Sequence, residues 1–232
     1  MKLQTAARTA WAAACVATLG LLGTAAATTA TAAPAAGTIS AGTISAGTGD
    51  AGTNSLAAVL AADGDTFDHN WYDFDVVDQA VAAVLAAKPD SPVAVLADGT
   101  VPLTAFLPND RAFQLLAFDL THRWERTEQG VLTRIAGAVG IDAVEAVLLY
   151  HVVPGATIDS RQALRSDDAR LTTALGPTFR VDVLSRRVPL VRLVDQDRND
   201  FNPFLVPSKL DINKGNLQIA HGITAVLRPI DL

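Results

Sequence analysis

Cysteine is nearly absent from this sequence, with Cys15 as the only one in 232 residues. It lies within an apolar stretch close to the N-terminus, so removal of that stretch would leave a chain with no cysteine at all. Such a chain forms no disulfide bond and has neither a thiol nucleophile nor a cysteine ligand for a metal. The folded part must therefore be stabilised by its hydrophobic core alone.

Basic residues are outnumbered by acidic ones. The chain has 18 Lys and Arg against 24 Asp and Glu, a formal net charge of −6. Without Lys2 and Arg8 the balance is 16 against 24, a net charge of −8. Only Arg186 and Arg187 are adjacent, so no basic stripe is present. This balance disfavours nucleic acids and anionic membrane surfaces as partners.

The motifs of common hydrolases and metal sites are also missing. The sequence has no G-x-S-x-G or S-x-x-K motif, and its four histidines form no H-x-H or H-E-x-x-H pattern. Two Asp-rich stretches fail the EF-hand pattern, because Asp68 and Asp200 stand where that pattern requires Gly. We predict acidic surface loops at both stretches, no metal, no cofactor and no enzymatic activity.

Residues 1–32 are predicted to form a secretory signal peptide. Lys2 and Arg8 precede an Ala-rich apolar run, and Ala30-Thr31-Ala32 fits a cleavage site. A transmembrane anchor would need a stronger Leu/Ile/Phe core with charges after it, so we favour the signal. Paired arginines are absent, which favours the general secretory route. We expect a secreted protein of bacterial type, released or associated with the cell wall.

Residues 33–53 form a low-complexity stretch in which a five-residue unit beginning Ala-Gly-Thr repeats. This composition cannot bury a core and predicts a flexible linker. An O-glycosylated stalk is the alternative, and we favour a plain spacer. The folded domain is expected over residues 54–232, with Asn54 or Ser55 as the first helix cap.

The period of the apolar residues changes along the domain. Helical spacing predicts helices over 56–63, 74–87, 110–118, 131–139 and 141–150, with Asp73 and Asn109 as caps and a buried strand over 103–107. Alternation predicts a hairpin of 179–184 and 188–194, and a second strand pair across Lys214-Gly215. Helices that come first and strands that follow indicate an α+β fold.

The stretch "VLLYHVVPG", residues 147–155, places Tyr150 and His151 at the end of a predicted helix. A catalytic His151 would need a nucleophile and an orienting acid, and no motif supplies them. We favour a packed histidine at a helix-to-strand junction with a ring nitrogen bonded to the backbone. His221 lies in "NLQIAHGI" on an apolar strand face, which favours a core residue over a metal ligand.

Three segments resemble the motifs of fasciclin (FAS1) domains, and the resemblance spans about residues 74–232. "LTAFLPNDRAF" resembles the first signature, "LLYHVVPG" the Tyr-His motif, and "NLQIAHGITAVLRP" the second signature. The motif residues carried over as structural are Thr104, Phe106, Pro108, Asn109, Phe113, Pro154, Gly155, His221 and Pro229. Two departures are Thr224 in place of an Asp, and a longer, polar connection over 119–130.

The resemblance implies a wedge of β-strands with helices packed on it, in a secreted or surface-anchored module linked to adhesion and matrix binding. It also makes Tyr150 and His151 candidate contact or supporting residues, and their apolar flanks favour support. The expected partner is an extracellular or cell-surface protein or polysaccharide. A secreted carrier of a small apolar ligand or polysaccharide is the alternative, and a hydrolase is the least favoured reading.

Further candidate binding residues come from the polar surroundings of three aromatics. Trp71, Tyr72 and Trp124 lie among polar residues, as contact aromatics do, although half-burial at the edge of the core explains them equally well. The apolar loop "FNPFLVP", residues 201–207, could dock a partner, and we favour a loop folded onto the core.

Overall fold

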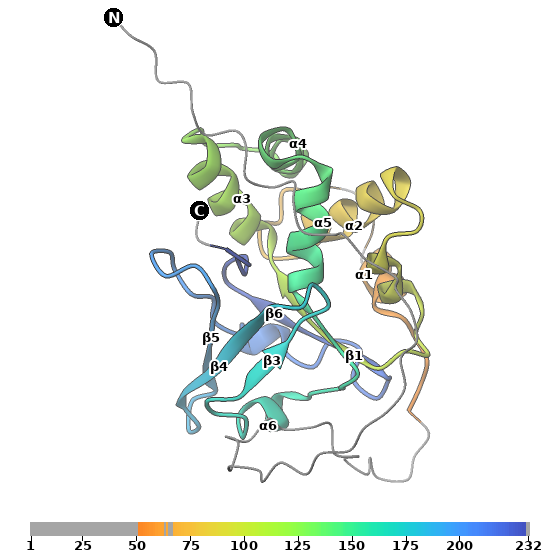
Figure 1. The fold of residues 1–232 in the computed structure, drawn as a ribbon, viewed down its shortest axis with the longest axis vertical. Coiled ribbons are helices and arrows are strands. Elements are labelled where there is room, and N and C mark those ends of the chain that lie inside the picture. The colour runs from red at the N-terminus through yellow and green to blue at the C-terminus, as the bar shows by residue number, and fades with distance from the viewer. Residues whose placement is uncertain (1–50, 63, 65–66, 231–232) are drawn as a thin grey trace, which may run out of the picture. The chain divides into compact units, whose positions relative to one another are not determined.

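The computed structural model describes residues 51–62, 64 and 67–230 (Figure 1). The predicted signal peptide, with Cys15, and the linker up to residue 50 lie outside the described residues. The described chain begins as a paired segment. The Gly52 N–H bonds the Gly215 carbonyl at 2.9 Å, and the Leu217 N–H bonds the Gly52 carbonyl at 2.9 Å. This pairing begins two residues before Asn54, where we predicted the domain to start.

Most helices precede residue 151, as predicted. They are α1 (Leu56–Ala61), α2 (Asp75–Ala87), the 3₁₀ helix η1 (Pro92–Ala97), α3 (Asp110–Thr121), α4 (Glu128–Val139) and α5 (Ile141–Tyr150). Two short ones follow, α6 (Ser160–Ala163) and η2 (Pro207–Lys209). The predicted caps Ser55 and Asn109 are confirmed, since their side chains accept the N–H groups of Ala58 and Ala112.

The predicted cap of α2 is wrong. Asp73 does not cap this helix, whose N-cap position is Phe74 and has no side-chain hydrogen bond of its own. The carboxylate of Asp110, the first residue of α3, accepts the N–H of Val76 at 2.9 Å instead. An acceptor supplied from 34 residues away does the work of a local cap, which local sequence patterns cannot reveal.

The strands form two small sheets. In the first, β1 (Leu103–Pro108) lies between β2 (Val152–Pro154), which is antiparallel to it, and β6 (Gln218–Ile223), which is parallel. The second contains β3 (Arg170–Thr172), β4 (Thr178–Ser185) and β5 (Leu190–Val194), all antiparallel. The hairpin predicted for residues 179–194 is therefore confirmed, with an irregularity between Val183 and Ser185.

The pair predicted across Lys214-Gly215 is largely wrong. Only one bridge, between Ile212 and Ala220, joins its two halves, whereas β6 pairs along its whole length with β1. Every residue of β1 and β6 is buried, as expected for parallel neighbours covered on both faces.

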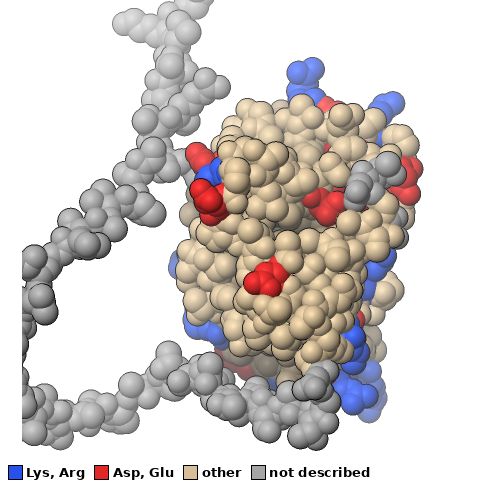
Figure 2. Space-filling view, turned by 90° about the vertical axis from the view of Figure 1, so that its right-hand side faces the viewer, with Lys and Arg blue, Asp and Glu red and all other residues tan. Residues whose placement is uncertain are grey.

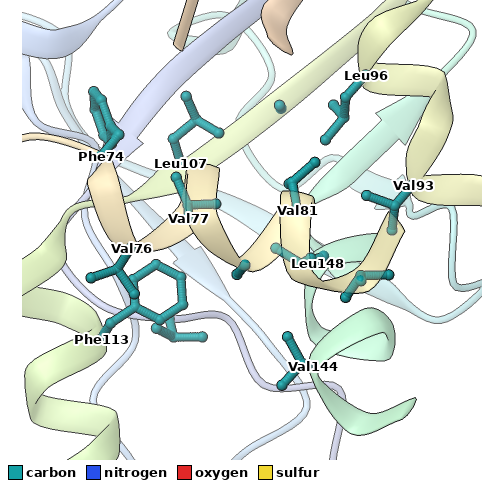
Figure 3. Packing of buried hydrophobic residues seen from close by; sticks show 14 of the residues in the cluster. Phe74, Val76, Val77, Val81, Val93, Leu96, Leu107, Phe113, Val144 and Leu148 are labelled. Atoms are coloured by element: carbon teal, nitrogen blue, oxygen red, sulfur yellow. The ribbon is translucent and has the colours of Figure 1, made fainter. Parts of the chain in front are cut away.

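Alternate residues of β1 face two separate hydrophobic cores. Leu103, Ala105 and Leu107 join the helices in the first core, where Figure 3 shows side chains from α2, α3, α5 and β1 around α2. Phe106 points to the second core with residues of β4 and β5, and its ring meets Phe179 edge-on at 5.2 Å. The α+β class is thus as predicted. None of the helices in the described ranges has the length and apolar character needed to cross a membrane.

Candidate functional site

Tyr150 and His151 lie between the two cores, at the end of α5. Tyr150 is 0% and His151 4% exposed, so neither side chain is available to touch a partner. The direct-contact role considered for this pair is therefore corrected, and a supporting role is left.

Both ring nitrogens of His151 are used in buried hydrogen bonds. Nδ1 donates to the Val147 carbonyl at 2.7 Å, and Nε2 accepts the N–H of Leu227 at 2.9 Å. Burial lowers the pKa of His151 to about 4, so the ring is neutral at pH 7. A general base needs a free lone pair aimed at a substrate, and this one is bonded to the backbone. His151 joins α5 to the C-terminal segment.

Tyr150 is held in the second core. Its hydroxyl donates to the Thr178 carbonyl at 3.2 Å, and its ring meets Phe179 edge-on at 6.2 Å. Burial, followed by the nearby charge of Asp195, raises the pKa of Tyr150 to about 12. The Tyr-His pair therefore connects α5 to β4 through one side chain and to the C-terminal segment through the other.

His221 is also a satisfied core residue. Its Nε2 donates to the Ile158 carbonyl at 2.8 Å, and its Nδ1 accepts the Asp211 N–H at 3.2 Å. Burial lowers its pKa. Thr104, on the neighbouring strand β1, donates to the Ala156 carbonyl at 2.7 Å and accepts the Ile158 N–H. These bonds fix residues 156–158 across the first sheet.

The other motif residues hold turns and packing. Phe106 and Phe113 are buried, Pro108 ends β1, and Pro154 ends β2. Gly155 has a φ of +78°, a conformation that favours glycine. Pro229 is half-buried beyond the last strand.

Thr224, which replaces the family Asp, bonds the loop of residues 201–207. Its hydroxyl accepts the Phe204 N–H at 2.9 Å, and its own N–H donates to the Phe204 carbonyl at 3.0 Å. The next residue, Leu205, is buried in the second core. The loop is therefore folded onto the core, as we favoured, although Phe201 at its start is exposed.

Two of the three predicted binding aromatics, Trp71 and Trp124, contact Arg111. The Arg111 N–H donates to the Trp71 carbonyl at 2.9 Å, and its guanidinium lies 4.8 Å from the centre of the Trp124 ring. Tyr72, the next residue after Trp71, is strongly exposed, while Trp71 itself is half-buried against the first core. Tyr72 and Trp124 are therefore exposed, whereas Trp71 is half-buried at the edge of the core.

Two exposed residues of α3, Leu115 and Phe118, extend this surface. Phe118 is 42% and Trp124 44% exposed, and their rings meet at 5.7 Å. Leu115, one turn before Phe118, is exposed on the same side of the helix. The residues of this aromatic surface are Trp71, Tyr72, Arg111, Leu115, Phe118 and Trp124.

Leu115 and Phe118 escaped the sequence reasoning because the apolar residues of α3 lie on more than one side of the helix, between polar ones such as Gln114 and Asp119. Phe113, Leu116 and Ala117 are buried on its other side. A signal was present, because the two exposed residues lie three apart and neither matches the spacing of the buried ones. An apolar excess over what one helix face can bury indicates a second contact face.

The polar connection between α3 and α4 holds Trp124 in place. Gln114 of α3 donates its amide to the Glu125 carbonyl at 2.6 Å, and Glu125 pairs with Arg134 of α4. At the end of α3, Asp119 pairs with the buried Arg228 at 2.8 Å. The long, polar connection over 119–130 therefore exposes Trp124 on a loop that is held by hydrogen bonds and an ion pair.

A small hollow lies beside α1 and α2. Its volume is about 340 Å³, near the lower end of small-molecule sites. Figure 2 views the molecule from the side of α1 and α2 and shows acidic side chains within a hollowed area. The residues that line the hollow are Val59, Leu60, Ala62, Phe74, Asp75, Asp78, Lys209 and Ile212. Five of these eight residues are apolar and three are charged, a combination that suits a small amphipathic molecule.

One group of side chains among the described residues has the spacing to hold a metal ion. Asp68, Asp73 and Asp75 each place one carboxylate oxygen within 4.8 Å of the other two.

A comparison with family models agrees with two of the motifs. A family model described as "Fasciclin domain" matches residues 78–203, more than half of the chain, and this segment includes two of the three motifs. No curated protein matches. One similar solved structure is a FAS1 domain pair from the insect cell adhesion molecule fasciclin I, with 14% identity and a TM-score of 0.46. The match covers 67% of this chain and 48% of that one, so the chain spans about half its length.

Proposed function

Since the chain belongs to the fasciclin domain family, which is known for adhesion and binding, we propose that it is a secreted, non-enzymatic adhesion module. Its proposed partner is an extracellular or cell-surface protein or polysaccharide. The predicted signal peptide would export the chain, and the predicted linker would hold its single bacterial-type domain away from the wall or release it into the medium.

The observation that carries this proposal is the aromatic surface. Trp, Tyr and Arg are the residues most enriched among those that dominate binding energy at interfaces. Here Trp124 is flanked by Arg111 and Phe118, and all three extend into solvent from α3 and the loop after it. Rings fixed by neighbouring rings and by the Gln114 bond lose little freedom on binding, which favours affinity.

The Tyr-His motif has a different part in this proposal. Tyr150 holds α5 against β4, His151 holds it against the C-terminal segment, and α5 packs in the first core with α3. Their contribution to binding is indirect, through the position of the helices that carry the surface.

The proposal is tested by a pull-down of matrix and cell-wall components with the full chain. Trp124→Ser and Phe118→Ser should each lower the affinity for a captured partner by about 30-fold, the effect of a residue contributing about 2 kcal/mol. Val188→Ser is the matched control, because Val188 is an exposed apolar residue in the turn between β4 and β5. Equal binding by all three variants would reject the aromatic surface as the contact site.

The hollow beside α2 favours a second candidate function, a carrier of a small amphipathic ligand. A carrier would purify with a bound small molecule, and its melting temperature would rise when that molecule is added back. Ile212→Trp would fill the hollow and abolish this rise while leaving partner capture by the aromatic surface intact.

A further inference from the structure

Five carboxylates meet where three helices begin. Asp75, Asp110 and Glu128 are the first residues of α2, α3 and α4, and Asp73 lies two residues before Asp75. Asp68 joins them from the loop before α2, with one oxygen within 4.8 Å of oxygens of Asp73 and Asp75. The electrostatic influence of Glu128 reaches both Asp75 and Asp110.

Three of these carboxylates are buried with oxygens that lack a partner. Asp73 is 6%, Asp110 0% and Glu128 1% exposed. Asp73 Oδ1, Asp110 Oδ2, Glu128 Oε1 and Asp75 Oδ2 accept no hydrogen bond from an N–H or hydroxyl group of the described residues. Buried carboxylates in proteins are paired with cations or coordinate metals, because removing an unpaired charge from water is very costly.

Backbone N–H groups stabilise only some of these carboxylate oxygens. Asp110 Oδ1 accepts the Val76 N–H at 2.9 Å, and Glu128 Oε2 accepts the His69 N–H at 3.2 Å. The positive ends of three helix dipoles favour acidic residues here as well. Each of these effects leaves the second oxygen of the side chain unsatisfied, and none of the ion pairs within the described ranges involves the five residues.

The chemistry of the donors selects the kind of cation, and their spacing is compatible with it. All the donors are carboxylate oxygens, which suit hard ions such as Ca²⁺ and Mg²⁺, and no sulfur or imidazole nitrogen belongs to the group. Ca²⁺ binds oxygens at about 2.3–2.6 Å, so two ligands on opposite sides of it lie about 4.8 Å apart. Ca²⁺ also tolerates the irregular geometry of ligands from a loop and a helix start, whereas Mg²⁺ demands a near-ideal octahedron.

We propose that Asp68, Asp73 and Asp75 bind a calcium ion at the start of α2, with Glu128 and Asp110 as the buried carboxylates that complete its negative surroundings. The site differs from an EF-hand because its ligands do not follow the loop spacing of that motif, which is why the sequence pattern missed it. Exposed Asp68 forms the entry side, and the buried members form the floor.

A proton shared between Asp73 and Asp110, whose side chains hydrogen-bond to each other, is the competing way to reduce this charge.

Calcium binding would also bear on the aromatic surface. Trp71 and Tyr72 lie in the chain between the ligands Asp68 and Asp73, so an ion bound by those ligands would fix the segment that presents both rings. This consequence rests on the proposed function, whereas calcium binding itself does not.

The test is a thermal unfolding series on the EDTA-treated full chain at pH 7, with added CaCl₂ or MgCl₂. Calcium at 100 times its dissociation constant should raise the melting temperature by about 5–10 °C for a domain of this size. Asp75→Asn should abolish this rise without lowering the melting temperature in EDTA, because it removes a repelling charge and keeps the shape of the side chain. Asp90→Asn is the matched control and should respond as wild type, since Asp90 lies beyond the other end of α2.

A second readout uses Tb³⁺, which takes the oxygen ligands of Ca²⁺ and emits when a nearby indole is excited. Emission sensitised by tryptophan and displaced by calcium should appear in wild type and Asp90→Asn and be lost in Asp75→Asn. Calcium that leaves the melting temperature unchanged would overturn the proposal in favour of proton sharing. An equal response to Mg²⁺, or a response retained in Asp75→Asn, would overturn it in favour of nonspecific ion binding. None of these results depends on partner capture.

Discussion

Replacing His151 by Leu removes both buried hydrogen bonds of the imidazole while keeping a side chain of similar volume. The Val147 carbonyl and the Leu227 N–H, which lie 2.7 and 2.9 Å from the ring nitrogens, would then be left without partners. Each unsatisfied buried group costs about 1–3 kcal/mol, so the free energy of unfolding at pH 7 should fall by about 2–6 kcal/mol.

The loss of stability should depend on pH in a defined direction, whereas a loss due to packing alone would not depend on pH. The pKa of His151 is about 4 in the folded chain against 6.5 when unfolded. Between these values the unfolded chain binds a proton that the folded chain does not, so the stabilisation is complete above pH 6.5 and is lost as the pH falls toward 4. The difference corresponds to about 3 kcal/mol.

The assay is urea unfolding of wild type and His151→Leu at several pH values from 7 to 4. The advantage of wild type should shrink by about 3 kcal/mol over this range, since the leucine variant has no such proton to bind. Asp75 and Asp195 have raised pKa values, which stabilise the folded state as pH falls. Their contribution to the free energy of unfolding is the same in both chains and cancels in the difference. His122→Asn, at an exposed histidine, should stay within about 0.5 kcal/mol of wild type. An advantage of wild type that is the same at pH 7 and pH 4 would refute the reasoning.

Three further substitutions test other buried contacts, each by urea unfolding. Tyr150→Phe removes the hydroxyl with its bonds to the Thr178 carbonyl and to Gln196 and should cost about 1–3 kcal/mol, with capture of partners unchanged; a cost above about 4 kcal/mol would contradict this. Phe113→Ala empties a buried position of the first core and should cost about 3–5 kcal/mol, and a loss below 1 kcal/mol would show that the site collapses. Arg228→Met leaves the buried Asp197 carboxylate without its cation and should cost about 3–5 kcal/mol, whereas a neutral result would mean that water reaches Asp197.

Local signals in the sequence predicted most elements of the fold. Asn109 lies directly before an apolar helical pattern, and the structure shows its side chain capping α3. The alternation over residues 179–194 likewise gave the hairpin of β4 and β5. The failures involve contacts between distant segments. The cap of α2 comes from Asp110, and β6 pairs with β1, more than 100 residues earlier in the chain. Neither contact leaves a local pattern.

The candidate site divides in the same way. The polar setting of Trp71, Tyr72 and Trp124 was visible in the sequence, whereas the contacts of Trp71 and Trp124 with Arg111 depend on the approach of the loop before α2 to the start of α3. The motif containing His151 drew attention to a residue whose two ring nitrogens are fully occupied inside the protein. A motif alone does not tell whether a residue supports the fold or contacts a partner. The burial of its side chain does.

The most direct test of the adhesion account is a hydrogen-exchange comparison of the full chain, free and bound to a captured matrix or wall component. The account predicts new protection at residues 71–72 and 111–124, which carry the aromatic surface, with little change in the turn around Val188. Protection concentrated on the β4–β5 hairpin, with none along α3, would contradict it and place the contact surface on the second sheet.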